Sequence, residues 1–300
     1  QTAVITGAAS GFGLELARLG AQKGLNLVLT DVQQEALDKV VAELTAAGAH
    51  VAALRGDVSR GEDIQALADL CLERFGVPHI VINNAGVAYG GLIWEAGPRD
   101  WEWVLGVNLW GVIHGVRVFT PLMLAEARKN PAYQGHIVNV ASMAGMLNSP
   151  NLGVYNVSKH AVVSLSETLY QDLALVTDQV HASVLCPYFV PTGIHQSHRN
   201  RPAELRTDAK PTASQLIGQA MSAKAVTSGK VTAADTAALV FNAIEANQFY
   251  VYTHPKAIGM VQVRMEDVMQ ARNPTDPFAG KPEIGEQLKT ALRDALAKED

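Results

Sequence analysis

The chain has 300 residues, 48% of them hydrophobic and 18% charged, which is enough for one large α/β domain or two small ones. The formal net charge is −5 and no basic stripe is visible, so nucleic acid is not an expected partner. Cys71 and Cys186 lie far apart in apolar contexts, so neither a disulfide framework nor a cysteine metal site is expected, and a reducing, cytoplasmic compartment fits.

No apolar run approaches the length of a membrane span, and no basic-then-apolar leader opens the chain, so we expect no membrane partner. The chain starts directly with a strand-like segment and has no initiator methionine. We therefore expect the natural chain to begin a few residues earlier.

Strand and helix patterns alternate along the chain. Apolar runs predict seven strands, at residues 3–6, 26–30, 50–54, 80–83, 136–140, 182–186 and 249–252. Helical patterns fill the gaps, at residues 13–23, 33–47, 61–75, 100–129, 155–177 and 233–246. The repeated β-α-β order predicts a Rossmann-type, doubly wound parallel sheet with helices on both faces, in a single domain over residues 1–252.

Two segments depart from this alternation. Residues 188–230 form a long insertion rich in Pro, Ser, Thr and Ala, and a connection of this length is typical of a functional lid or a disordered segment. We interpret it as a substrate lid. Residues 253–300 follow the last strand and predict a helical C-terminal extension of the same domain, with helices near residues 258–271 and 284–298.

A glycine-rich turn joins the first strand to the first helix. Its residues Gly7, Ser10, Gly11, Phe12 and Gly13 give the spacing G-x-x-x-G-x-G. Glycines at this place allow a tight turn and let backbone N–H groups approach a pyrophosphate at a helix N-terminus. The alternative is a tight strand–helix turn without a ligand.

Asp31 ends the second strand, about 20 residues after the glycines. A carboxylate there can accept hydrogen bonds from both ribose hydroxyls of NAD, and it would repel the 2′-phosphate of NADP. Neither Val32 nor Gln33 is basic. The sequence therefore favours NAD, although Asp31 without the glycine turn would read equally well as a turn or N-cap residue.

Tyr155 and Lys159 are four residues apart, with Ser142 thirteen residues before the tyrosine. Residues at this spacing share one face of a helix, and a nearby ammonium lowers the pKa of a phenol. A hydroxyl, a phenol and an ammonium that converge are suited to acid/base chemistry on an alcohol or carbonyl. Taken alone, the spacing also fits an ordinary surface pair on a helix.

These motifs together carry a family resemblance. The segment from Thr6 to Gly13, Asn84-Ala85-Gly86 after Asn83, Asn108, Ser142, and Tyr155-x-x-x-Lys159 stand in order. The chain resembles the short-chain dehydrogenases/reductases, clearly over residues 1–193 and by pattern over 231–252.

The resemblance implies four catalytic residues. Tyr155 would exchange a proton with the substrate oxygen, and Lys159 would bind the nicotinamide ribose and lower the tyrosine pKa. Ser142 would hydrogen-bond the substrate oxygen. Asn108 would perturb a long helix and hold a water beside the lysine.

The resemblance also extends the cofactor site. It implies contacts from Asp57, Val58, Asn84, Ala85, Gly86, Pro187, Val190 and Thr192. Tyr188 occupies the usual glycine position after Pro187, so the roles of Val190 and Thr192 are less closely matched than those of the catalytic residues.

The substrate is less directly readable. Candidate pocket residues are mostly large and apolar, and they are Tyr89, Trp94, Met143, Leu147, Tyr188 and Phe189. They predict a hydrophobic or aromatic secondary alcohol or ketone. The basic residues of the insertion, Arg199, Arg201, Arg206 and Lys210, we interpret as solvated.

We expect no metal site, because His195 and His198 have no third ligand near them in sequence. Two other functions stay open: an NADP-dependent carbonyl reductase, and a non-catalytic dinucleotide-binding protein. The family resemblance further implies a homodimer or homotetramer through the long helices at residues 100–129 and 155–177.

Overall fold

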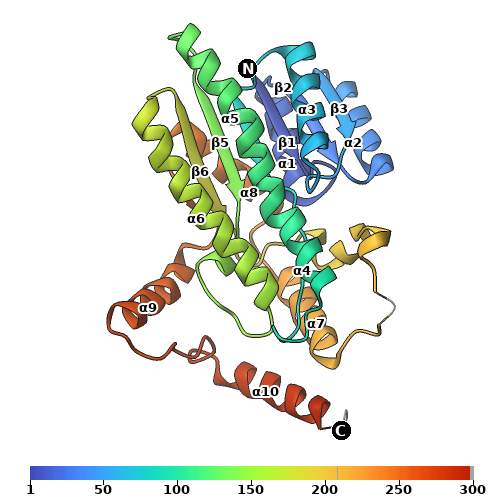
Figure 1. Cartoon of the computed structure of the whole chain (residues 1–300), viewed down its shortest axis with the longest axis vertical. Coiled ribbons are helices and arrows are strands. Elements are labelled where there is room, and N and C mark those ends of the chain that lie inside the picture. The colour runs from blue at the N-terminus through green and yellow to red at the C-terminus, as the bar shows by residue number, and fades with distance from the viewer. Residues whose placement is uncertain (208, 298–300) are drawn as a thin grey trace.

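The sheet of the computed structural model has seven parallel strands in the order β3-β2-β1-β4-β5-β6-β7, and the structure describes residues 1–207 and 209–297 (Figure 1). This confirms the predicted Rossmann-type, doubly wound sheet. Each strand lies within two residues of its predicted position. The strands are β1 (Thr2–Thr6), β2 (Asn26–Asp31), β3 (Val51–Arg55), β4 (Ile80–Asn83), β5 (Gly135–Val140), β6 (Val180–Cys186) and β7 (Tyr250–Tyr252).

Alternating side chains of the strands supply two core layers. In β1, Ala3 and Ile5 pack with residues of α1, α2 and α8, whereas Val4 packs on the other face with residues of α3, α5 and α6. A strand alternates its side chains between faces, so an all-apolar strand needs helices on both sides. These helices are α1 (Gly11–Gln22), α2 (Gln34–Ala46), α3 (Gly61–Phe75), α5 (Gly111–Lys129), α6 (Gly153–Val176) and α8 (Ala233–Glu245).

The strand order reverses between β1 and β4, which are neighbours although they are not consecutive in sequence. In open α/β sheets, ligands bind beyond the carboxyl ends of the strands at such a switch point. The glycine turn follows β1, and Asn84 follows β4. The fold therefore brings these two segments together.

The predicted helix at residues 100–129 is not uniform. It consists of α4 (Pro98–Leu105), a π-helical turn (Gly106–Trp110) and α5. By length and composition alone, the stretch Pro98–Lys129 could cross a membrane, contrary to the expectation from the sequence, but a core helix passes the same test. Here it packs against α3, α6 and the sheet.

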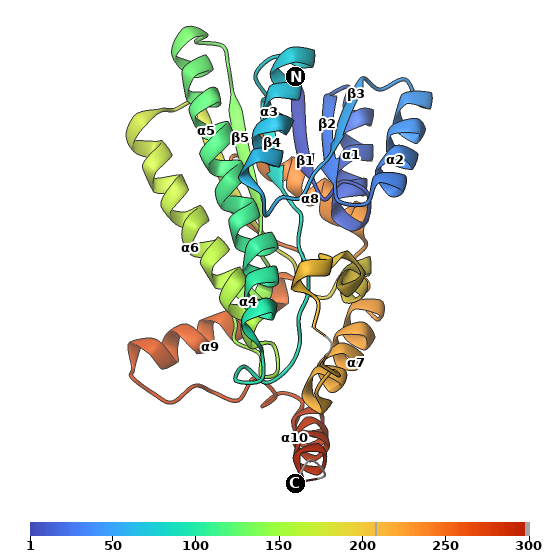
Figure 2. The ribbon, with the colours of Figure 1, turned by 45° about the vertical axis from the view of Figure 1, so that its right-hand side comes forward.

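The insertion and the C-terminal extension lie at the end of the sheet toward which the strands point (Figures 1 and 2). The insertion holds two 3₁₀ segments, η3 (Gly193–Asn200) and η4 (Ala203–Leu205), and the helix α7 (Ala213–Thr227), which the sequence did not predict. The extension holds α9 (Ile258–Met269) and α10 (Pro282–Leu296), and α10 packs against α7. Position 208 of the predicted lid and positions 298–300 of the predicted extension lie outside the described residues.

Candidate active site

The glycine turn depends on close backbone approach. Gly7 and Gly11 have φ values of +64° and +55°, in the left-handed region that favours glycine. A Cβ on Gly13 would lie 2.0 Å from the carbonyl oxygen of Gly7, so no side chain fits there. The turn consequently opens directly into α1, whose first N–H groups have no partner within the helix.

The ends of β1 and β4 are joined by polar contacts. The Thr6 hydroxyl accepts hydrogen bonds from the N–H groups of Asn84 at 3.0 Å and Ala85 at 3.1 Å. The Asn84 side-chain amide donates in return to the carbonyls of Thr6 at 2.9 Å and Gly7 at 3.1 Å. Asn84 therefore holds the glycine turn in place. Thr6 was not singled out for this role, although it opens the glycine motif.

The Asp31 carboxylate is held by two backbone groups. One oxygen accepts the N–H of Ala9 and the other the N–H of Gln33, each at 3.0 Å. Sequence inspection of neighbouring positions missed Arg55, which reaches over from β3 and donates to the carbonyl of Val32 at 3.0 Å. Asp31 lines the cavity described next, and Arg55 does not.

One cavity of about 1450 Å³ joins the glycine turn to the catalytic candidates. It is lined by most of the predicted cofactor residues: Gly7, Ser10, Gly11, Phe12, Asp31, Asp57, Val58, Asn84, Ala85, Gly86, Pro187, Val190 and Thr192. Gly13 is buried behind the turn rather than at the cavity wall. The cavity also reaches Ser142, Tyr155 and Lys159, so the two halves of the predicted site form one space.

Ser142, Tyr155 and Lys159 meet where β5 ends and α6 begins. The Ser142 hydroxyl accepts the N–H of Ala144 at 3.1 Å. Lys159 is 2% exposed, and its Nζ lies 5.7 Å from the centre of the Tyr155 ring and donates to the Val140 carbonyl at 3.0 Å. The three side chains therefore lie together at this end of the sheet.

Burial is the largest influence on the pKa values of Tyr155 and Lys159. Burial raises the pKa of the Tyr155 phenol, and a hydrogen bond with Ser142 acts in the opposite direction. Burial also lowers the pKa of Lys159 to about 8. Because the lysine ammonium contacts a backbone carbonyl in this geometry, its predicted lowering of the Tyr155 pKa stays a prediction.

Asn108 sits in the π-helical turn and is fully buried. Its Oδ1 accepts the N–H of Val87 at 2.8 Å, and its Nδ2 donates to the Val87 carbonyl and to Ser158, both at 3.0 Å. Ser158 in turn donates to the Tyr155 carbonyl at 2.8 Å. Asn108 thus connects the segment after β4 to the first turn of α6, and π-helical turns recur at functional sites for such reasons.

The predicted substrate residues divide into two groups. Met143, Leu147, Tyr188 and Phe189 line the cavity, together with Tyr89. Trp94 does not: its side chain is 74% exposed and lies outside the cavity wall. Glu95, the next residue, lines the cavity, so the position of Trp94 after Asn84 in sequence did not bring its own side chain to the substrate side.

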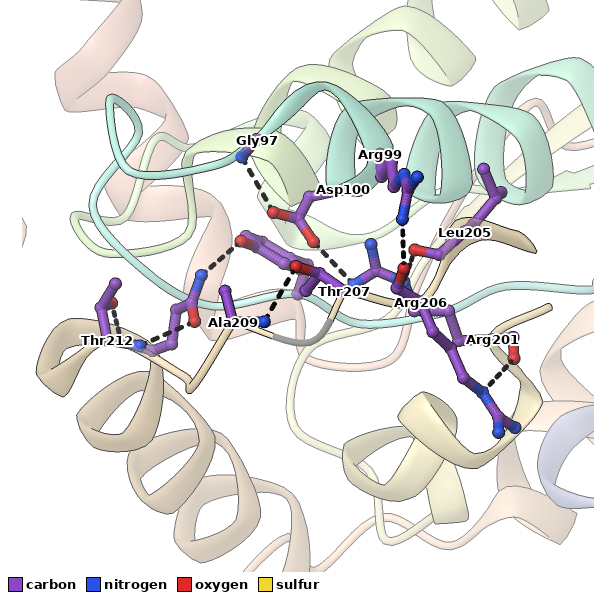
Figure 3. A network of polar contacts seen from close by, with 11 residues as sticks. Gly97, Arg99, Asp100, Arg201, Leu205, Arg206, Thr207, Ala209 and Thr212 are labelled. Atoms are coloured by element: carbon purple, nitrogen blue, oxygen red, sulfur yellow. Dashed lines mark hydrogen bonds and ion pairs between the residues drawn. The ribbon is translucent and has the colours of Figure 1, made fainter. Parts of the chain in front are cut away.

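The interpretation that the basic residues of the insertion are solvated is wrong for Arg201. Its Nη1 lies 2.6 Å from Asp100 Oδ1, and its Nε donates to the Leu205 carbonyl at 2.7 Å (Figure 3). Its guanidinium lies over the ring of Trp103, 5.2 Å from the ring centre. These contacts attach the insertion to α4.

The start of α7 is attached to the same region. Glu95 Oε2 accepts hydrogen bonds from the hydroxyls of Thr212 at 2.5 Å and Ser214 at 2.6 Å. Gln215 Nε2 donates to the Tyr89 hydroxyl at 2.7 Å. A carboxylate at a helix N-terminus is also favoured by the helix dipole. The described residues of the insertion therefore form part of the cavity wall.

His195 and His198, considered as metal ligands from the sequence, both lie on η3. Within residues 1–207 and 209–297, no group of three or more His, Cys, Asp or Glu side chains is placed to hold a metal ion.

Comparison with known proteins gives consistent matches. The family description "short chain dehydrogenase" matches residues 1–203. A CLA biosynthesis dehydrogenase/reductase of Lactiplantibacillus plantarum is 33% identical over 88% of this chain and 92% of its own length.

Two solved structures are also similar. A short-chain dehydrogenase/reductase from Burkholderia phymatum, crystallised in complex with NAD, is 53% identical with a TM-score of 0.90, over 92% of this chain and 97% of that one. A metagenomic short-chain oxidoreductase in complex with NADP is 27% identical with a TM-score of 0.65, over 85% of this chain and 97% of that one. Both nicotinamide cofactors therefore occur among the structural relatives.

Proposed function

The chain belongs to the short-chain dehydrogenase family of oxidoreductases, and we propose that it interconverts a hydrophobic or aromatic secondary alcohol and its ketone with NAD(H). The observation that supports this most directly is the continuous cavity. Its lining includes Asp31 as well as Ser142 and Tyr155. An extended dinucleotide and a substrate require such a shared space.

The chain's own residues fit a nicotinamide dinucleotide. The N-terminus of α1 would receive the pyrophosphate, because the N–H groups of its first turn have no partner within the helix and the glycines of the turn allow a close approach. Asp31 would hold the adenosine ribose, and two backbone N–H groups already orient its carboxylate. Lys159 would bind the nicotinamide ribose. We infer a preference for NAD because an additional phosphate would meet the Asp31 carboxylate.

The chemistry then divides between cofactor and protein. When bound, the nicotinamide supplies or accepts the hydride. In the oxidising direction, Ser142 holds the substrate hydroxyl and Tyr155 accepts its proton as the carbon loses the hydride. Lys159 keeps positive charge beside the phenolate that must form. Asn108 positions these groups, because it braces the start of α6 through Ser158.

Several large apolar side chains lie in the cavity wall near Ser142 and Tyr155 in sequence or beside them in the lining. Met143 is buried, and the rings of Tyr188 and Phe189 contact each other in a tilted arrangement with ring centres 4.2 Å apart. Such walls favour a hydrophobic or aromatic substrate by burying its apolar surface.

The test of this function is a Tyr155→Phe variant. With NAD and a panel of secondary alcohols, followed by NADH absorbance, we expect kcat to fall by about 100-fold or more, because general acid/base catalysis contributes that much. Tyr170→Phe, an exposed tyrosine on the same helix, is the matched control and should retain activity. Near-native turnover by Tyr155→Phe would overturn the assignment. An absence of turnover in the wild type, with NADH still bound, would favour the non-catalytic alternative.

The preference for NAD has a separate test. Asp31→Ser removes the carboxylate and keeps a small polar side chain. We expect the ratio of kcat/KM for NAD to that for NADP to fall by at least about 10-fold, since one charge-assisted hydrogen bond contributes roughly 1.5–3 kcal/mol. An unchanged ratio would mean that Asp31 does not contact the ribose, and a wild type that prefers NADP would support the carbonyl reductase alternative.

We also propose the organisation expected from the sequence. Residues 1–252 form the catalytic domain with 188–230 as its lid, and 253–300 form a helical extension. We infer self-association through residues 100–129 and 155–177, where Trp110 and Val157 are 49% and 44% exposed. We also propose that the protein is cytoplasmic. Light scattering of the purified protein would distinguish a homodimer or homotetramer from a monomer.

A further inference from the structure

The insertion extends along the cofactor half of the cavity and not only over the substrate half. Thr192, just before η3, lies against the glycine turn, since a Cβ on Gly11 would be 3.4 Å from the Thr192 Cβ. At the middle of η3, Ser197 accepts the N–H of Ala88 at 2.9 Å. The segment after β1 and the segment after β4 are therefore both in contact with η3 or the residue that precedes it.

The end of η3 reaches the adenosine end of the cavity. Gln33 Nε2 donates a hydrogen bond to Asn200 Oδ1, across 167 residues of sequence. The backbone N–H of Gln33 also donates to Asp31. Asp31, Gln33 and Asn200 all line the cavity, so the amide pair stands beside the carboxylate proposed to bind the ribose.

We propose that Asn200 and Gln33 form a closure over the adenosine ribose, so that the insertion takes part in holding the cofactor and in selecting against a 2′-phosphate. This proposal rests on the proposed function, because it requires a dinucleotide bound along Asp31. The wall beside Asp31 would then come from two distant segments: the residues after β2 and the end of η3.

The chemistry of this closure differs from that of Asp31. The charge of Asp31 would repel the 2′-phosphate of NADP. The two neutral amides, bonded to each other, would instead leave no space for that phosphate. A 2′-phosphate would need the space that their contact closes, and a ribose hydroxyl would not. Dissociation of the cofactor would require this contact to break, which slows release.

The adjacent Arg199 has the opposite tendency, because a cation attracts phosphate. It also lines the cavity, but its side chain is exposed and its Nη1 donates to Gln196 at 3.1 Å. In this arrangement the Gln33–Asn200 contact, and not the Arg199 guanidinium, would lie beside the adenosine ribose. Opening the pair should then give a 2′-phosphate both space and a partner.

The test compares Asn200→Leu with the wild type in NADH and NADPH binding, measured by fluorescence titration and stopped-flow release. Loss of one hydrogen bond should weaken NADH binding about five-fold and speed its release similarly. NADPH binding should stay the same or tighten, so the preference for NADH should fall at least about five-fold. Gln33→Leu should reproduce this effect, and the double variant should add little to either single change.

Gln34→Leu is the matched control. It removes an exposed amide from the residue next to Gln33, at a position outside the cavity wall, and it should leave both affinities unchanged. If Asn200→Leu and Gln33→Leu bind NADH and NADPH as the wild type does, the contact is only a tether between loops and the proposal is overturned. If the wild type itself binds neither cofactor, the proposed function fails instead.

Discussion

The ion pair between Arg201 and Asp100 should stabilise the contact between the insertion and α4 (Figure 3). Asp100→Asn removes the charge but keeps an oxygen that can still accept the Gly97 N–H, which Asp100 now accepts at 2.9 Å at the start of α4. The change therefore separates the ion pair from the helix cap. Arg201 would be left against the ring of Trp103 with a neutral partner.

The magnitude follows from the burial of the pair. Removing one partner of a buried ion pair costs about 3–5 kcal/mol. The side chains of Arg201 and Asp100 retain 13% and 11% exposure, so screening by water reduces the cost. We expect Asp100→Asn to destabilise the closed insertion by about 2 kcal/mol, which corresponds to roughly 30-fold more frequent opening.

Hydrogen exchange measured by mass spectrometry is the suitable assay, because it reports opening of the insertion separately from global unfolding. Peptides covering η3, η4 and α7 should exchange faster in Asp100→Asn, and peptides from β4 and β5 should not. Glu102→Gln, which removes an exposed negative charge from the same helix, is the control and should exchange as the wild type.

A double-mutant cycle with Arg201→Met decides whether the effect belongs to the pair. A coupling energy of about 1 kcal/mol or more is expected for side chains in direct contact. A coupling below about 0.5 kcal/mol, or equal exchange of the insertion in all variants, would refute the reasoning, because Asp100 and Arg201 would then act independently.

Two further predictions concern stability. Burial lowers the pKa of His136 to about 4. Between pH 6.5 and pH 4 the unfolded chain therefore binds a proton at this residue that the folded chain does not. The free energy of unfolding should consequently fall by about 3 kcal/mol as the pH drops through this range. Urea unfolding across this range should show a smaller fall in His136→Gln, and an equal fall would contradict this origin. Gly13→Ala places a Cβ on the Gly7 carbonyl and should lower the free energy of unfolding by about 3 kcal/mol, whereas Gly259→Ala, with open space around it, should not. Urea unfolding of the two variants checks this, and equal stability would mean that the backbone at Gly13 relaxes without cost.

The fold was predictable because its signals are local. Each strand is a short, largely apolar run, and the helices that cover the sheet bury residues spaced three or four apart, as Leu37, Val40 and Leu44 are in α2. The family resemblance predicted a perturbation of the long helix at Asn108, but the composition did not reveal its π-helical form, because it continues the helical pattern on both sides. α7 was missed even though Thr212 and Gln215 form a capping box, a sequence signal that could have located its start.

The candidate site divides in the same way. Ser142, Tyr155, Lys159 and the glycine turn follow strand ends or share one helix, so the rules of parallel sheets bring them together. Trp94 does not line the cavity as predicted, because closeness in sequence to a site loop does not determine which way a side chain points. Its loop leaves it exposed to solvent.

The contacts of the insertion could not be predicted from the sequence, for a physical reason. Arg201 looks like any solvated arginine until Asp100 is known to lie against it, and the two are 101 residues apart. The position of Asn200 in the cavity wall is likewise explained only by its hydrogen bond with Gln33. Neither pair has a periodicity or a motif, because an irregular segment is positioned by individual polar contacts rather than by a repeating apolar face. In the roles that we propose for Asn200 and Gln33, such contacts would decide which cofactor fits, so specificity is the property that most requires the structure.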